Sequence, residues 1–167
     1  MGGHMRPFRF WYNMRMSFED IVAVLEHAFK LELKVVEDAT AFEVASEDGG
    51  TRIKVLVQNA DERRKVLLSA DIGEMPPEGG AKLMRTMLEA NNLFTGTAGA
   101  TLALDAAAGR FRLQKYESPD ELANDAEPKL VSFIETALFW SRSIADFKPS
   151  VDDAADTGSG GYGMIQV

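Results

Sequence analysis

The residue types that carry out catalysis are sparse in this chain of 167 residues. It contains no cysteine and two histidines, His4 and His27. Residues 1–5 read as an expression scar, so His27 is the only native histidine that could act as a catalytic base. A hydrolase triad needs such a base beside a nucleophile. His27 falls at the boundary of an apolar helix face, where we expect a solvated or locally hydrogen-bonded side chain.

Acidic and glycine-rich segments also lack the spacing of a metal or cofactor site. Asp152, Asp153 and Asp156 lie close together, but their spacing does not match the ligand positions of an EF-hand loop. Residues 96–99 precede a predicted strand, whereas a phosphate-binding loop precedes a helix whose amides face the anion. We therefore expect no enzyme activity, no cofactor and no bound metal.

The net charge and the distribution of apolar residues limit the classes of partner. The formal net charge is -8, and such a surface repels nucleic acid and anionic lipid, which bind to clustered Lys and Arg. No apolar run reaches the roughly 18 residues that a membrane span requires. The lack of cysteine fits a reducing compartment. We expect a cytoplasmic protein that binds no nucleic acid and does not insert into a membrane.

The first half of the sequence predicts one helix and three strands. Ser17 can cap a helix whose first turn holds Asp20, which is a capping-box pattern. Apolar residues then recur at helical spacing as far as Phe29. Turns rich in glycine and charge separate the strands, which gives a helix at residues 18–29 and strands at 42–46, 51–58 and 65–72. Residues 31–36 could either extend the helix or form an edge strand.

The second half predicts a helix, a hairpin and a last helix. The helix at residues 81–92 has an apolar stripe made of Leu83, Met84, Met87 and Leu88. Strands at 98–104 and 110–116 form the hairpin. A cap pattern at residues 118–121 favours the start of the last element. We expect Pro128 to divide a short first piece from a main helix that ends near Phe147.

Together these elements predict an α+β fold in the order α-β-β-β-α-β-β-α, with helices packed on a mostly antiparallel sheet. One domain is expected at residues 17–147. Residues 1–16 then form the expression scar and an N-terminal extension, and residues 148–167 an acidic, glycine-rich tail. The apolar character of residues 8–12 and 162–167 suggests that either segment could dock in a groove.

Residues 91–113 resemble one known family, the class I type III secretion chaperones, or Tir-chaperone (CesT-like) family. Residues 84–94 (MRTMLEANNLF) resemble its second helix and the Asn-Leu-Phe ending of that helix. Residues 100–105 (ATLALD) and 109–114 (GRFRLQ) resemble its fourth and fifth strands. The family's order of elements is the one predicted above, and the resemblance covers about residues 17–147.

The resemblance implies a homodimer that binds the non-globular N-terminal segment of a secretion effector before export. In this family the second helix and the following strand build much of the dimer interface, which nominates Leu83, Met87, Leu88, Leu102 and Leu104. The effector segment wraps over the first helix and the first three strands, which nominates Val22, Leu25, Phe29, Val44, Ile53 and Val55. Each nominated residue could instead be a plain core residue.

A second interpretation is a general protein-interaction or adaptor domain of similar α+β fold, such as a YbjN-like protein, with no role in secretion. Either protein would bind an extended peptide by strand addition and side-chain pockets. Neighbouring genes for secretion components or effectors would favour the chaperone.

Overall fold

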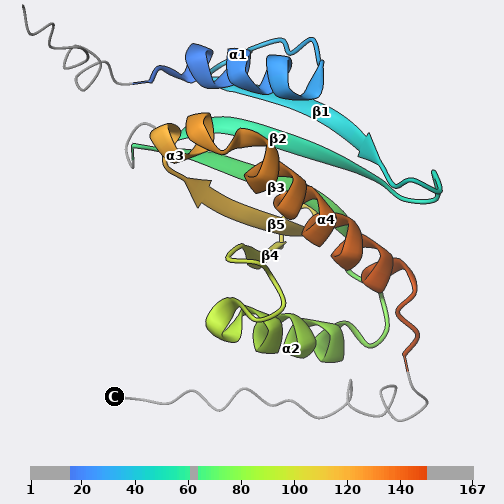
Figure 1. Cartoon of the computed structure of the whole chain (residues 1–167). Coiled ribbons are helices and arrows are strands. Elements are labelled where there is room, and N and C mark those ends of the chain that lie inside the picture. Colours follow the sequence, from blue (N-terminus) through green and yellow to red (C-terminus); the bar gives the residue numbers. More distant parts are fainter. Residues whose placement is uncertain (1–15, 61–63, 150–167) are drawn as a thin grey trace, which may run out of the picture.

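The computed structural model describes residues 16–60 and 64–149, and these residues form one antiparallel sheet with four α-helices around it (Figure 1). The two segments predicted to dock in a groove, 8–12 and 162–167, lie outside the described residues. The strand order is β1-β2-β3-β5-β4, so β1 and β4 are the two edges. The strands are β1 (Ala39–Ala45), β2 (Arg52–Ala60), β3 (Lys65–Glu74), β4 (Thr101–Asp105) and β5 (Arg110–Glu117).

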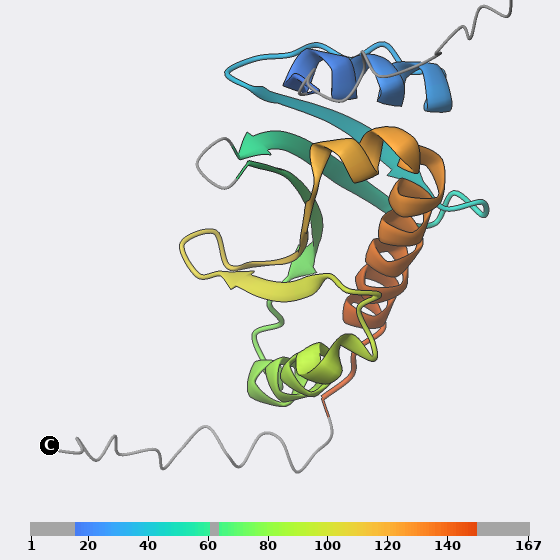
Figure 2. The same ribbon diagram turned by 60° about the vertical axis from the view of Figure 1, so that its left-hand side comes forward.

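The helices divide between one face of the sheet and one end of it. Three of them, α1, α3 and α4, pack together on one face, and α4 contacts β2 and β3 along its length (Figures 1 and 2). The fourth, α2, lies beside β4 at the far end of the sheet from α1. Their bounds are α1 (Phe18–Phe29), α2 (Gly80–Asn91), α3 (Pro119–Asn124) and α4 (Ala126–Ala145), with a short 3-10 turn, η2 (Asn92–Phe94), after α2. The predicted α+β order is confirmed.

The first helix begins and ends where local chemistry dictates. The Ser17 hydroxyl accepts the Asp20 N–H at 3.2 Å, and the Asp20 carboxylate accepts the Ser17 N–H at 2.8 Å. These bonds form the predicted capping box, and they lower the pKa of Asp20 below its ordinary value. Lys30, in a left-handed conformation with φ 52°, ends the helix.

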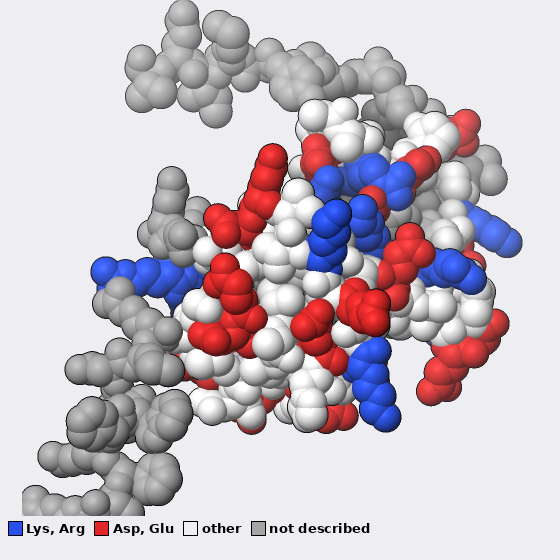
Figure 3. Space-filling model, turned by 90° about the horizontal axis from the view of Figure 1, so that it is seen from above, with Lys and Arg blue, Asp and Glu red and all other residues white. Residues whose placement is uncertain are grey.

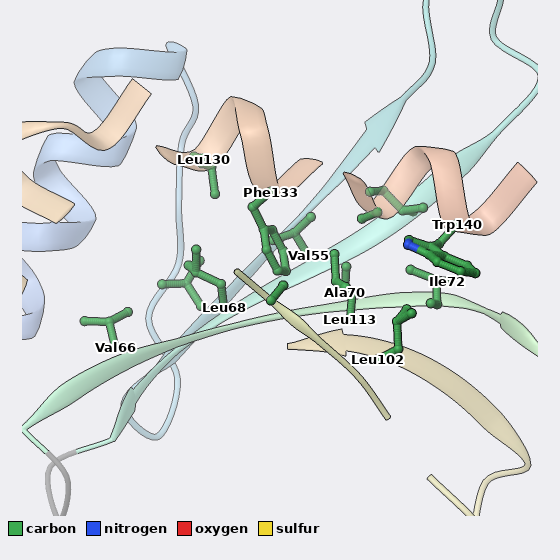
Figure 4. Packing of buried hydrophobic residues seen from close by; sticks show 14 of the residues in the cluster. Val55, Val66, Leu68, Ala70, Ile72, Leu102, Leu113, Leu130, Phe133 and Trp140 are labelled. Atoms are coloured by element: carbon green, nitrogen blue, oxygen red, sulfur yellow. The ribbon is translucent and has the colours of Figure 1, made fainter. Parts of the chain in front are cut away.

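The hydrophobic core lies between the sheet and α4 (Figure 4). Alternate residues of β2 and β3 point toward the helix, as the two-residue period of a strand requires. Val55, Leu68 and Leu113 are completely buried on three neighbouring strands, and Leu130 and Phe133 of α4 pack above them. This packing fixes α4 over the middle of the sheet and leaves β1 at its margin.

Three local predictions need correction. The break in the last element falls at Asp125, and Pro128 lies in the first turn of α4, where the missing N–H needs no partner. Residues 31–36 extend neither α1 nor the sheet, apart from an isolated bridge between Val36 and Ala39. Leu88, predicted as part of the apolar stripe of α2, is 69% exposed.

A buried ion pair joins α4 to β5. The carboxylate of Glu117 is 4% exposed and accepts a hydrogen bond from Lys129 Nζ at 2.8 Å, while Lys115 Nζ lies 3.0 Å from its other oxygen. Burial by itself would raise the pKa of Glu117, but the hydrogen bonds and charges of the two lysines outweigh it and hold the pKa below its ordinary value. The contact anchors the start of α4 to the sheet.

Candidate functional site

The two edges of the sheet are protected differently. At the β4 edge, the side-chain amide of Asn91 pairs with the backbone of Leu102. Its Oδ1 accepts the Leu102 N–H at 2.8 Å, and its Nδ2 donates to the Leu102 carbonyl at 3.0 Å. An exposed edge strand is a template for pairing with another chain. Asn91 blocks that template at the second residue of β4, so this edge is a poor place for an added strand.

The β1 edge keeps its outward backbone groups available. The Ser46 N–H donates to the Thr51 carbonyl and the Asn59 N–H to the Asp38 carbonyl, which fixes the phase of the ladder between β1 and β2. In an antiparallel pair, hydrogen-bonded positions alternate with positions whose backbone groups point away from the partner strand. The backbone groups of Ala41, Glu43 and Ala45 therefore face outward, away from β2.

An apolar groove runs beside this edge, and we call it the β1 groove. It has a volume of about 410 Å³ and lies between the end of α1, strand β1 and the first half of α4. Its floor and walls include Phe29, Phe42, Val44, Val131 and Ile134, with Leu31, Ala45 and the two acidic residues Glu43 and Glu135 also in the lining. Phe42 and Val44 alternate along β1 and line the groove, whereas the outward backbone groups belong to the residues between them.

Two of the six residues nominated for effector binding line the β1 groove. Phe29 lies at its α1 end and Val44 on its β1 wall. The other four fill the core, with exposed fractions of 5% or less, and these are Val22, Leu25, Ile53 and Val55. A bound segment could not touch these four side chains in the present arrangement. The role of all six in effector binding stays a prediction.

Sequence reasoning missed several residues of the groove. Phe42 and Val44 are two residues apart in the predicted strand, so the alternation would have placed Phe42 on the same face as Val44. Val131 and Ile134 are three residues apart on α4, which is the spacing of one helix face. Which residues of α4 meet the core and which meet the groove depends on where β1 lies beside the helix.

The residues nominated for a dimer interface also divide into two groups. Leu83, Met87 and Leu102 are 4–6% exposed, because they pack α2 against the rest of the chain. Leu88 and Leu104 are 69% and 38% exposed. Both stay candidates for the interface. The three buried residues could not contact a second protomer and would only hold α2 and β4 in position.

The turn after α2 adds two exposed apolar residues to this end of the molecule. Leu93 and Phe94 are 83% and 52% exposed, and both have positive φ angles of 55° and 56°. Such backbone is unfavourable for bulky side chains and is found mainly where surrounding structure holds it for a purpose. Trp140 Nε1 donates a hydrogen bond to the Gly96 carbonyl at 2.9 Å, which fixes the turn to α4. The turn therefore presents apolar side chains to solvent at a cost in backbone strain.

The described residues offer no arrangement for metal binding or for membrane insertion. Among residues 16–60 and 64–149, no group of three or more His, Asp or Glu side chains could hold a metal ion. Within the same residues, no helix is both long and apolar enough to cross a membrane. His27 is exposed on α1, and acidic and basic side chains lie side by side on the face seen in Figure 3.

Comparison with known proteins identifies relatives of the fold and of the sequence. The sequence model of the Tir chaperone protein (CesT) family matches residues 47–141. Curated protein sequences give no match. Among solved structures, the ExsC-ExsE complex matches with a TM-score of 0.60 and 18% identity, covering 78% of this chain and 97% of the other.

Two further solved structures share the fold. A chain of the HopA1-SchA chaperone-effector complex has a TM-score of 0.56 and 14% identity, over 78% of this chain and 94% of that one. A chain of the heterodimeric ExoU-SpcU complex, from the type III secretion system of Pseudomonas aeruginosa, has a TM-score of 0.51 and 18% identity. It is matched over 77% of this chain and 98% of its own length.

Proposed function

Because the chain belongs to the Tir chaperone protein (CesT) family, we propose that it is a cytoplasmic homodimer that binds the non-globular N-terminal segment of a type III secretion effector. Binding keeps this client soluble and competent for export. Two of the similar solved structures are named as a chaperone-effector complex and as a complex from a type III secretion system. The family is one of chaperones, and holding a client needs binding energy but no catalytic group or cofactor.

The observation that carries this proposal is the β1 groove beside an outward-facing strand edge. An extended client can pair its backbone with Ala41, Glu43 and Ala45, as in strand addition. Every second client side chain then points to the same face as Phe42 and Val44. Apolar residues at those positions would fill the groove between β1 and α4. Backbone pairing supplies affinity for any extended chain, and the groove selects alternate apolar side chains.

The charges at the groove indicate which client sequences it prefers. Glu43 and Glu135 line the groove, and the whole chain carries a net charge of -8. Complementary charge steers association and suppresses the wrong partners. The client segment should therefore be poor in Asp and Glu, with Lys or Arg beside its apolar residues.

The dimer is proposed to form at the opposite end of the sheet. Leu88 of α2, Leu93 and Phe94 of the turn and Leu104 of β4 supply exposed apolar surface there. Apolar surface of this kind marks protein interaction sites. Because β1 and β4 are opposite edges of the sheet, an interface at the α2 end leaves both β1 grooves of the dimer open to clients.

The test is co-expression of the full chain with N-terminal segments of effectors encoded in its own operon. Val131→Glu places a charge in the groove at a residue that is already 38% exposed, so the fold should survive. Phe139→Glu is the matched control, because it adds the same charge to the same helix at a residue that is 61% exposed and does not line the groove. We expect Val131→Glu to lose the client and Phe139→Glu to keep it. Equal recovery of the client with both variants would move the site elsewhere.

A further inference from the structure

We propose that the chain's own N-terminal segment, residues 6–12, occupies the β1 groove when no client is bound. The inference rests on the proposed function, because it assigns a built-in competitor to the same groove. Three features carry it, namely the charge of the segment, its pattern of apolar residues and the length of chain that joins it to α1.

The charge of the segment is opposite to that of the groove. Residues 6–15 (RPFRFWYNMR) hold three arginines, and the first acidic residue of the chain is Glu19. The charged residues of the groove lining are both acidic, Glu135 on α4 and Glu43 on β1, and the Glu43 side chain lies on the other face of that strand. The remainder of the chain carries all of the acidic residues, so the segment is a basic arm on an acidic domain. Attraction between the two is expected on charge alone.

The apolar pattern of the segment suits a strand at the β1 edge. Phe8, Phe10 and Tyr12 alternate, so an extended backbone places all three on one face. On β1, Phe42 and Val44 line the groove from alternate positions in the same way. Arg9 would then fall on the other face of the added strand, which is the face of the Glu43 side chain between Phe42 and Val44. Pro7 lacks a backbone donor and would end the pairing at its outer end.

The connection to α1 has the right length and direction. The helix has 12 residues, so it is about 18 Å long, and Phe29 of the groove lies at its far end. Phe8 and Phe10 precede Met16 by eight and six residues, which span about 20–28 Å when extended. In Figures 1 and 2, α1 and β1 run in the same direction. A segment that returns along α1 toward Met16 therefore runs antiparallel to β1, the direction that an added antiparallel strand needs.

Tethering makes a weak contact effective. A short covalent connection to α1 raises the local concentration of the segment to about the millimolar range. The segment can then shield the apolar groove from solvent and from exposed apolar surfaces of other proteins until a client binds. A client must displace it, so weak binders are rejected while strong binders are retained.

The test is photocrosslinking in the full chain without any client. Phe10→p-benzoylphenylalanine puts the crosslinker on the apolar face of the segment. After irradiation, mass spectrometry should find links to the β1 groove, at β1 or at Val131–Ile134 of α4. Mixing isotopically light and heavy protein should show that the linked residues belong to one chain. Val131→Glu should lower the yield by about fivefold or more, and the control Phe139→Glu should leave it unchanged.

Several results would overturn the proposal. Links to the cavity at the start of α1, which is lined by Arg64, Lys65 and Asp120, would assign the segment to that site. Links between two chains, or no links at all, would also contradict an occupant of the same chain's groove. Because no client is present, a negative result leaves the client-binding test standing. Links to the groove with no client recovered in the co-expression test would instead remove the proposed function alone.

Discussion

Substitution of Leu88 by glutamate tests where the proposed dimer forms. The side chain is 69% exposed on α2 in the single chain. Burying a leucine completely contributes about 1.5–3 kcal/mol, so covering the exposed fraction of Leu88 contributes about 1–2 kcal/mol per copy. A two-fold interface contains the residue twice, which gives about 2–4 kcal/mol. Loss of that contribution weakens dimerisation by about 30- to 700-fold, and two buried carboxylates would weaken it further.

Sedimentation equilibrium over a range of concentrations measures this effect directly. Leu88→Glu should dissociate at concentrations where the unmodified chain is dimeric, and its thermal unfolding as a monomer should change little because the residue is exposed. Met87→Glu is the contrasting variant, since Met87 is 4% exposed and a charge there should unfold α2 as well. An unchanged dimer dissociation constant for Leu88→Glu would place the interface away from this face of α2.

Two further predictions concern contacts that position the site. Asn91→Ala leaves the N–H and carbonyl of Leu102 without their partner, so the free energy of unfolding should fall by about 1–3 kcal/mol. Because the β4 edge is then unblocked, the variant should also aggregate faster in light-scattering measurements. An unchanged free energy of unfolding would mean that water replaces the amide. Glu117→Gln removes the charge that Lys115 and Lys129 share. Because both lysines are about a quarter exposed, the free energy of unfolding should fall by about 1–3 kcal/mol, which is below the range for a fully buried pair. Because the folded pKa of Glu117 is lowered, its contribution is present above its ordinary pKa of 4.5 and is lost as the pH falls through the folded value. Denaturant unfolding of the unmodified chain and of Glu117→Gln should therefore converge at low pH, and a constant difference across that window would contradict the assignment.

The elements of the fold could be predicted because each has a local cause. The capping box at Ser17 and Asp20 sets the start of α1, and the two-residue alternation in β2 sets a strand. Pro128 misled the prediction, since its lack of a donor is equally compatible with a helix break and with the first turn of α4. Whether Pro128 breaks the helix depends on whether the carbonyl four residues earlier belongs to the same helix. The spacing of apolar residues does not show this.

The candidate site could be predicted only in part. Phe29 and Val44 reach the groove, whereas Val55 has the same residue type and a similar alternation but is completely buried beneath α4. What separates them is their distance from the covering helix, because α4 passes over the middle strands and leaves β1 at its margin. An apolar pattern identifies a face of an element, but tertiary packing decides whether that face meets the core or a groove.

The contrast between the two sheet edges is the reason that we propose client binding at β1. Asn91 occupies the backbone of β4 at Leu102, and the exposed apolar residues near it belong to helix and turn. The edge at β1 combines outward backbone groups with a groove on the same side. A client held there lies far from the proposed dimer interface, so each protomer could hold part of one client chain.

Amide hydrogen exchange at β1, followed by NMR in the free chain and in the complex with its client, reports whether the client pairs with this edge of the sheet. Exchange in the complex should be slower at Ala41, Glu43 and Ala45, whose N–H groups face outward. Phe42 and Val44, whose amides already pair with β2, should change little and serve as the internal control. Unchanged exchange at the three outward amides in a saturated complex, with protection gained at another surface, would contradict client binding at the β1 edge.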